Sequence, residues 1–183
     1  MIALGLLAGA AGTAALDMVS YADMLGRGRA ASDLPATVVA KLADRIGLVS
    51  LATGADETTR NRRSAIGSLL GYGVGIGAGV AYAAVRPSVR AWLPWPIAGA
   101  ILGAATLVAS EGSATALGAT DWRTWTATEW IADVVPRTAY GLVVAWMVEY
   151  LSDLDDETIA LRDRRTAHDR DAAHSVIDEE RVI

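Results

Sequence analysis

Three residues in the last long apolar segment have types and spacing that could carry chemistry. Asp133, Arg137 and Tyr140 follow one another at intervals of four and three residues, so on a helix they share one face. Asp133 and Arg137 can pair directly across one turn, and an ionised arginine at membrane depth must face protein or a water-filled cavity. The spacing therefore indicates a polar site for a proton, an ion or a small anion. The alternatives are a buried ion pair that fixes helix register, and charged side chains that extend to the membrane surface.

Two further acidic residues lie inside apolar segments. Asp17 follows 16 uncharged residues, and Glu111 follows a long apolar run. Because buried charges need partners, we expect Asp17 and Glu111 to meet Asp133 and Arg137 in one layer of a helical bundle. Tyr140 lies one turn beyond that layer.

The elements that must position these side chains are four apolar segments, each close to the ~20 residues that a membrane-spanning helix needs. Over half of the chain is apolar, at 52%, and it contains 18 glycines. We expect an all-α, polytopic protein of the cell membrane (a bacterial-type inner membrane) with a four-helix membrane domain at 1–152. Its spans are expected at residues 2–25, 64–85, 96–117 and 129–151.

Glycines recur at every fourth position in three of these segments, which lets neighbouring helices approach closely. They are Gly5 and Gly9 in the first segment, Gly67, Gly71, Gly75 and Gly79 in the second, and Gly99 and Gly103 in the third. The second segment, residues 64–85, is expected to be the centre of the bundle and its most buried helix. Gly71→Leu or Gly75→Leu should then disrupt packing more than Leu69→Ala.

The connections carry their own signals. Residues 35–51 place apolar and charged side chains on opposite faces and predict one amphipathic surface helix. Residues 54–63 read as a polar loop and residues 86–90 as a tight turn. Thr126 and Glu129 fit a capping box, and Pro136 predicts a kink that frees the carbonyl of Ala132. Residues 153–183 form a charged tail, either partly helical or disordered.

Tryptophans flank the spans, as is typical of side chains that anchor a helix at the membrane surface. The expected anchors are Trp92, Trp95, Trp122, Trp125 and Trp130. Lys and Arg divide almost equally between the two sides, eight against seven. Three arginines directly before residue 64 favour a cytoplasmic connection at 26–63.

Several function classes find no support. The chain has no cysteine, and its only histidines, His168 and His174, lie in the tail, which leaves no His-based triad in the bundle. No nucleotide-binding motif or basic aromatic patch is present. We therefore expect that the chain is not an enzyme and that it has no cofactor, metal site or nucleic-acid partner. Two hypotheses rank well above an intramembrane enzyme. One is a small transporter or channel, and the other is a structural or accessory subunit that docks another membrane protein, or a second copy, through its glycine faces.

From Tyr82 onward, the order of features resembles the YagU-like bacterial inner-membrane proteins. The shared features are Tyr82, Pro87, Trp92 or Trp95, Gly99, Glu111, Leu117 with Gly118, the Trp-containing loop 122–130, and a last helix that ends near Glu149. A glycine-rich start with an acid at Asp17 is also similar. Glu111 stands where that family tends to carry a histidine, and residues 118–121 replace its Pro-rich motif. The resemblance implies architecture only, because the biochemical role of the family is not established.

Overall fold

The structure is a computed structural model that describes the backbone of residues 1–181 and the side chains of residues 1–162, 164 and 165. This part of the chain contains helices and no strand. Its elements are α1 (Ile2–Arg27), α2 (Leu34–Arg45), α3 (Val49–Thr53), α4 (Glu57–Val89), α5 (Trp95–Ala116), the short 3-10 helix η1 (Trp122–Thr124) and α6 (Ala127–Arg181). Four helical stretches are long and apolar enough to cross a membrane, which confirms the expected number: Ile2–Arg27, Glu57–Val89, Trp95–Ala116 and Ala127–Arg162.

Two helix ends are formed by capping residues that can be recognised in the sequence. Gly28 ends α1 with φ 62°, a left-handed conformation that glycine adopts without steric cost. The capping box before α6 is confirmed: the Thr126 N–H donates to Glu129 Oε2 at 2.6 Å, and the Glu129 N–H donates to Thr126 Oγ1 at 3.3 Å. Two of the N–H groups at this helix end are therefore satisfied reciprocally.

The single amphipathic helix expected at residues 35–51 is wrong, because the segment forms two helices, α2 and α3. Gly47 has φ 77° and the backbone closes a Schellman motif there. The Leu48 N–H donates to the Ala43 carbonyl at 2.8 Å, and the Gly47 N–H donates to the Asp44 carbonyl at 3.2 Å. The apolar spacing continues past this point, but the hydrogen bonds of α2 end there.

The polar loop expected at 54–63 is also wrong from residue 57 onward, where α4 has already begun. Asp56 caps the helix, accepting a hydrogen bond from the Thr59 N–H at 2.9 Å. Arg63 donates back to the end of α3, to the carbonyls of Leu51, Ala52 and Gly54. At its other end α4 continues through Pro87 to Val89, so the turn expected at 86–90 is helical for four of its five residues.

The helices pack as two antiparallel pairs through glycine. In the α1–α4 pair, a Cβ atom on Gly79 would lie 2.5 Å from the Cα of Gly9 and 2.7 Å from the carbonyl oxygen of Gly5. In the α5–α6 pair, a Cβ on Gly103 would lie 2.6 Å from the carbonyl oxygen of Arg137. Real Cβ atoms do not approach backbone this closely, so only glycine permits these contacts.

Helix α4 is the least buried of the four candidate spans, and the expectation that it is the most buried is wrong. Only 11% of its apolar window is buried, against 28–33% for the other three. Gly67, Gly75 and Gly79 meet neighbouring atoms, whereas Gly71, Gly73 and Gly77 have nothing within 4 Å of an added Cβ. The expectation that Gly71→Leu disrupts packing is therefore withdrawn, while that for Gly75, which meets Thr13 and Tyr140, stands.

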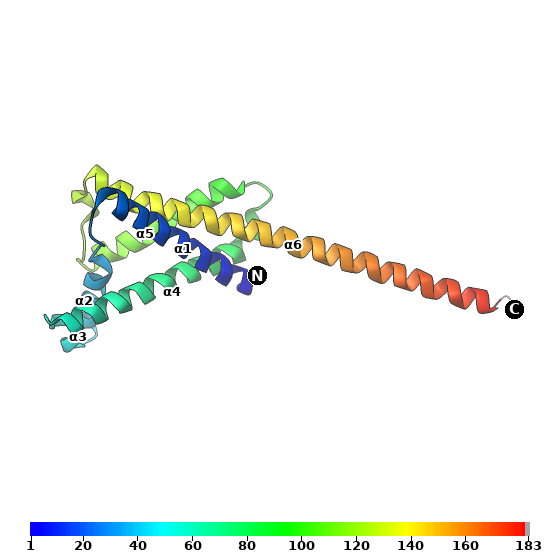
Figure 1. Cartoon of the computed structure of the whole chain (residues 1–183), viewed down its shortest axis with the longest axis horizontal. Coiled ribbons are helices and arrows are strands. Elements are labelled where there is room, and N and C mark those ends of the chain that lie inside the picture. The colour runs from blue at the N-terminus through cyan, green and yellow to red at the C-terminus, as the bar shows by residue number, and fades with distance from the viewer. Residues whose placement is uncertain (182–183) are drawn as a thin grey trace. The chain divides into compact units, whose positions relative to one another are not determined.

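Helices α1 and α4 do not stay in contact along their whole length. The two helices are closest near the start of α1 and separate toward α2 (Figure 1). Helix α2 fills part of this gap: Pro35 covers Gly67, and Val39 and Ala43 are buried. One end of the bundle is thus held by glycine contacts, and the other is wider and capped by α2.

Helix α6 extends well beyond the apolar segment. Its backbone is helical from Ala127 to Arg181, and Pro136 lies inside it without ending it. The chain divides into two compact units, Met1–Val148 and Glu149–Ile183. The second unit contains the charged tail, residues 153–183, whose described backbone is helical. The side chains of His168 and His174 lie outside the described residues.

Candidate polar site between α5 and α6

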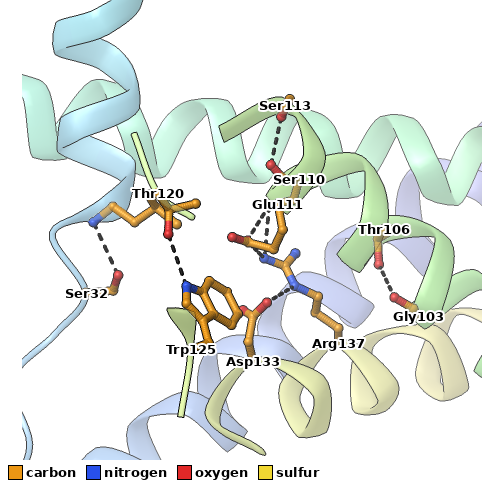
Figure 2. Close-up of polar contacts among 11 residues, drawn as sticks. Ser32, Gly103, Thr106, Ser110, Glu111, Ser113, Thr120, Trp125, Asp133 and Arg137 are labelled. Atoms are coloured by element: carbon orange, nitrogen blue, oxygen red, sulfur yellow. Dashed lines mark hydrogen bonds and ion pairs between the residues drawn. The ribbon is translucent and has the colours of Figure 1, made fainter. Parts of the chain in front are cut away.

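Arg137 joins two carboxylates at the wide end of the bundle. Its Nε donates to Asp133 Oδ2 at 3.0 Å, one turn earlier in α6, and its Nη2 donates to Glu111 Oε1 at 2.9 Å, across the helix pair. The same Nη2 lies 3.0 Å from Ser110 Oγ, which donates to Glu111 Oε1 at 3.1 Å. Figure 2 shows the guanidinium between the two carboxylates. The site is therefore an ion-pair triad, Glu111–Arg137–Asp133.

The local sequence explains why these three side chains meet. Glu111 lies two turns beyond Gly103 on the same side of α5, and Gly103 contacts the backbone of Arg137. That close contact brings α5 near enough for the long arginine side chain to reach along the interface. The four-residue spacing in α6 then supplies Asp133 from the same helix.

The two carboxylates differ in their access to water. The Glu111 side chain is 1% exposed, that of Arg137 is 17% exposed and that of Asp133 is 27% exposed. Glu111 Oε2 is buried and has no hydrogen-bond partner. Thr115 Oγ1, one turn further along α5, is also buried and has no partner. Side-chain exposure therefore decreases across the triad, from the solvent-accessible Asp133 through Arg137 to the buried Glu111.

Asp133 borders a pocket of about 420 Å³ at this end of the bundle. The end of α1, the start of α2, residues 119, 120 and 125, and the start of α6 line the pocket, which includes the charged side chains of Arg27, Arg29, Asp33 and Glu129. Ala132 also lines it. Because Pro136 has no N–H, the Ala132 carbonyl lacks its usual intrahelical donor.

Tyr140 lies deeper in the bundle, next to α1 and α4. It is 2% exposed, and its hydroxyl donates to the Gly75 carbonyl at 2.6 Å. Thr13, which is 6% exposed, donates to the carbonyl of Gly9 at 2.8 Å in the same region. Tyr140 therefore ties three helices together, and no hydrogen bond joins it to Arg137 among the described contacts.

Asp17 does not join the triad. Its Oδ2 accepts a hydrogen bond from the Tyr72 hydroxyl at 2.9 Å, so it pairs with α4. The sequence suggested four charged residues in one layer, and the structure brings three of them together. Sequence reasoning also overlooked Ser110 and Tyr72, whose only signal was a hydroxyl on an otherwise apolar helix.

The tryptophans lie at both ends of the bundle. Trp92 is 69% exposed in the connection between α4 and α5, and Trp95 begins α5. Trp122, Trp125 and Trp130 cluster at the pocket end, with ring centroids 6.3 Å apart for Trp122–Trp130 and 5.3 Å apart for Trp125–Trp130. Trp125 also donates to Thr120 at 3.1 Å, as seen in Figure 2. Of these three side chains, Trp125 lines the pocket.

The chemistry open to the site is that of charge and protons. The described part of the chain has no group of three or more His, Asp or Glu side chains placed to hold a metal ion. The triad offers two carboxylates, one guanidinium and a hydroxyl, a set that can bind or pass a small ion. Comparisons with protein-family models, curated proteins and solved structures find no match for this chain.

Proposed function

We propose that the chain is an integral membrane protein that moves a small ion or solute through the site formed by Glu111, Arg137 and Asp133. The observation that carries the proposal is the connection of the pocket to a buried charge. The pocket reaches Asp133, Arg137 links Asp133 to Glu111, and Glu111 is covered on all sides. Ionisable groups at membrane depth are costly and mark ion or proton pathways.

The proposal places the four apolar helices across a cell membrane of the bacterial inner-membrane type. The pocket then lies on the side of the connection between α1 and α4, and the arginines before the apolar part of α4 favour the cytoplasm for that side. The same four-span arrangement is implied by the resemblance to YagU-like proteins. No catalytic role is proposed for this site.

The test is charge movement in vesicles that contain only the purified chain. Gradients of H⁺, Na⁺, K⁺ or Cl⁻ are imposed in turn and the current is recorded. We expect one of these gradients to drive a current that Arg137→Ala abolishes and Ile131→Val, at a position in α6 that is 59% exposed, leaves unchanged. Correctly inserted protein that carries no current under any of the four gradients would contradict the proposal for ions. Resistance of the native protein to alkaline extraction from membranes tests insertion separately.

A second candidate function is that of an accessory subunit, and the uncovered face of α4 favours it. Gly73 and Gly77 are one turn apart, have open space around them, and would let another transmembrane helix approach closely. We propose that this occupant, where the accessory role applies, is a transmembrane helix of a different protein. Cysteines introduced at Val74, on a chain that has none, would then cross-link to that protein in native membranes, and Gly77→Leu would abolish the cross-link.

A further inference from the structure

We propose that the triad is a proton-binding site, in which Glu111 holds one proton at Oε2 and the three side chains together carry no net charge. The inference deepens the proposed transport role by naming the proton as the ion, and it rests on that role only for the movement of the proton. Binding itself can be tested without any transport. The Glu111 carboxyl group is buried, one of its oxygens is held by hydrogen bonds, and the other oxygen has no hydrogen-bond partner.

The first step is a charge count. Two carboxylates meet one guanidinium, so with both acids ionised the cluster carries one excess negative charge. No other charged side chain is bonded to it among the described residues. On α2, Arg45 donates instead to the Ala116 carbonyl at 3.2 Å, and on α1, Asp17 is held by Tyr72 of α4. A buried charge without compensation is strongly disfavoured, and one proton removes the excess.

The second step assigns the proton to one of the two acids. Asp133 is 27% exposed and borders the pocket, so water can solvate its charge. Glu111 is 1% exposed, and among the described residues its hydrogen-bond partners are Arg137 and Ser110. Burial disfavours the charged form of a carboxyl group, so the proton belongs on Glu111.

The third step assigns the proton to one oxygen. Oε1 of Glu111 accepts hydrogen bonds from both Arg137 and Ser110, while Oε2 has no partner. Protonation at Oε2 leaves both existing bonds intact, because a carbonyl-like Oε1 still accepts them. Thr115 Oγ1, a second buried oxygen without a hydrogen-bond partner, lies one turn along the same side of α5 and can accept the new O–H.

A metal cation fits the same space less well. Hard cations such as Ca²⁺ take about six to eight oxygen ligands, whereas the described residues of this site offer two buried oxygens without a partner, Glu111 Oε2 and Thr115 Oγ1. A proton needs one oxygen. Proton exchange occurs from the pocket side: above the titration range the proton leaves Glu111 for water, and the triad changes from neutral to singly negative.

The experiment records the infrared carbonyl stretch of protonated carboxylic acids for the full chain in lipid, while the pH is raised. We expect one acid band at neutral pH that disappears reversibly at alkaline pH. The band should be absent in Glu111→Gln, which keeps the shape of the side chain. It should also be lost at neutral pH in Asp133→Asn, because Glu111 and Arg137 then balance. Asp17→Asn is the matched control in another helix pair and should keep the band.

Isotope labelling keeps the test decisive if Glu111→Gln does not fold. Carbonyl-13C glutamate in the native chain should shift the band, and carbonyl-13C aspartate should not. Absence of an acid band at neutral pH, or a band that shifts with labelled aspartate, would overturn the inference. Persistence of the band in Asp133→Asn would overturn the charge count that underlies it. A Glu111 band in a chain that carries no current would instead support proton binding and contradict only the transport proposal.

Discussion

The same helices form both ends of the bundle, but different interactions hold the two ends together. At one end, Gly5 and Gly9 meet Gly79, and Gly99 meets Gly141, with backbone against backbone and no room for side chains. At the other end, the helices leave a pocket of about 420 Å³, and Arg137 spans the α5–α6 interface through its side chain. The first end is held by close packing, and the second by charges and hydrogen bonds.

The comparison shows how glycine makes a polar site possible. Each of three helices carries small residues and a charged residue on the same four-residue stripe: Gly5, Gly9 and Asp17 in α1, Gly99, Gly103 and Glu111 in α5, and Gly141, Arg137 and Asp133 in α6. The glycines set a short distance at one point. Because packed helices cross at an angle, the stripes then separate, and the longer polar side chains fill the space.

The largest expected effect is at the polar end. Arg137→Ala leaves two carboxylates without their shared cation, and the loss of one member of a buried pair costs about 3–5 kcal/mol. The free energy of unfolding in mixed detergent micelles measures this loss. The double variant Asp133→Ala with Arg137→Ala should recover part of it. Strict additivity of the two single losses would show that the residues are not coupled and that the polar end is not a single unit.

The next largest effect is at the glycine end. Gly79→Leu forces a side chain into the backbone of Gly5 and Gly9 and should destabilise the fold by about 1–3 kcal/mol, as overpacking does. Gly77→Leu on the uncovered side of the same helix is the matched control and should leave the melting temperature in detergent unchanged or slightly raised, since leucine favours helix more than glycine. Equal losses for both variants would mean that both faces of α4 are packed.

A smaller effect is expected between the two ends, at Tyr140. Tyr140→Phe keeps the buried ring and removes only the hydrogen bond to the Gly75 carbonyl, so the expected loss is about 1 kcal/mol. Thr106→Val, which removes a hydroxyl bonded within its own helix, is the control and should cost less. The free energy of unfolding in micelles would separate them. If Tyr140→Phe lowers the free energy of unfolding as much as Arg137→Ala does, the tyrosine contributes as much to stability as the triad, which contradicts this order of effects.

The smallest effect is expected outside the membrane segments, at the cap of α4. Hydrogen bonds from the Thr59 hydroxyl and N–H lower the pKa of Asp56 below its usual 3.8. The cap therefore contributes fully above that value, and its contribution is lost as the pH falls through the lowered pKa. Asp56→Ala should increase amide exchange in the first turn of α4 at neutral pH and leave exchange at Gly79 unchanged. Equal exchange in the first turn of both proteins would show that the cap contributes nothing.

Sequence patterns predicted the elements better than their ends. Apolar length alone predicted all four long helices, and the Thr126–Glu129 cap was predicted because it depends on residues three apart. The division of 35–51 at Gly47 was not predicted, because an apolar stripe continues across a break in hydrogen bonding. The exposure of α4 was not predicted either, since a glycine stripe shows which face can approach a neighbour but not whether a neighbour is there.

For the candidate site, the sequence by itself determined the pairing of Asp133 with Arg137, because a four-residue step in a helix brings two side chains together whatever surrounds them. Only the tertiary structure decided that Glu111 completes the site and that Asp17 does not. Both acids lie in the second half of an apolar helix, Asp17 in α1 and Glu111 in α5. Their partners depend on helix neighbours and rotation, which the close contact of Gly103 with Arg137 sets for Glu111 and which the pairing of α1 with α4 sets for Asp17.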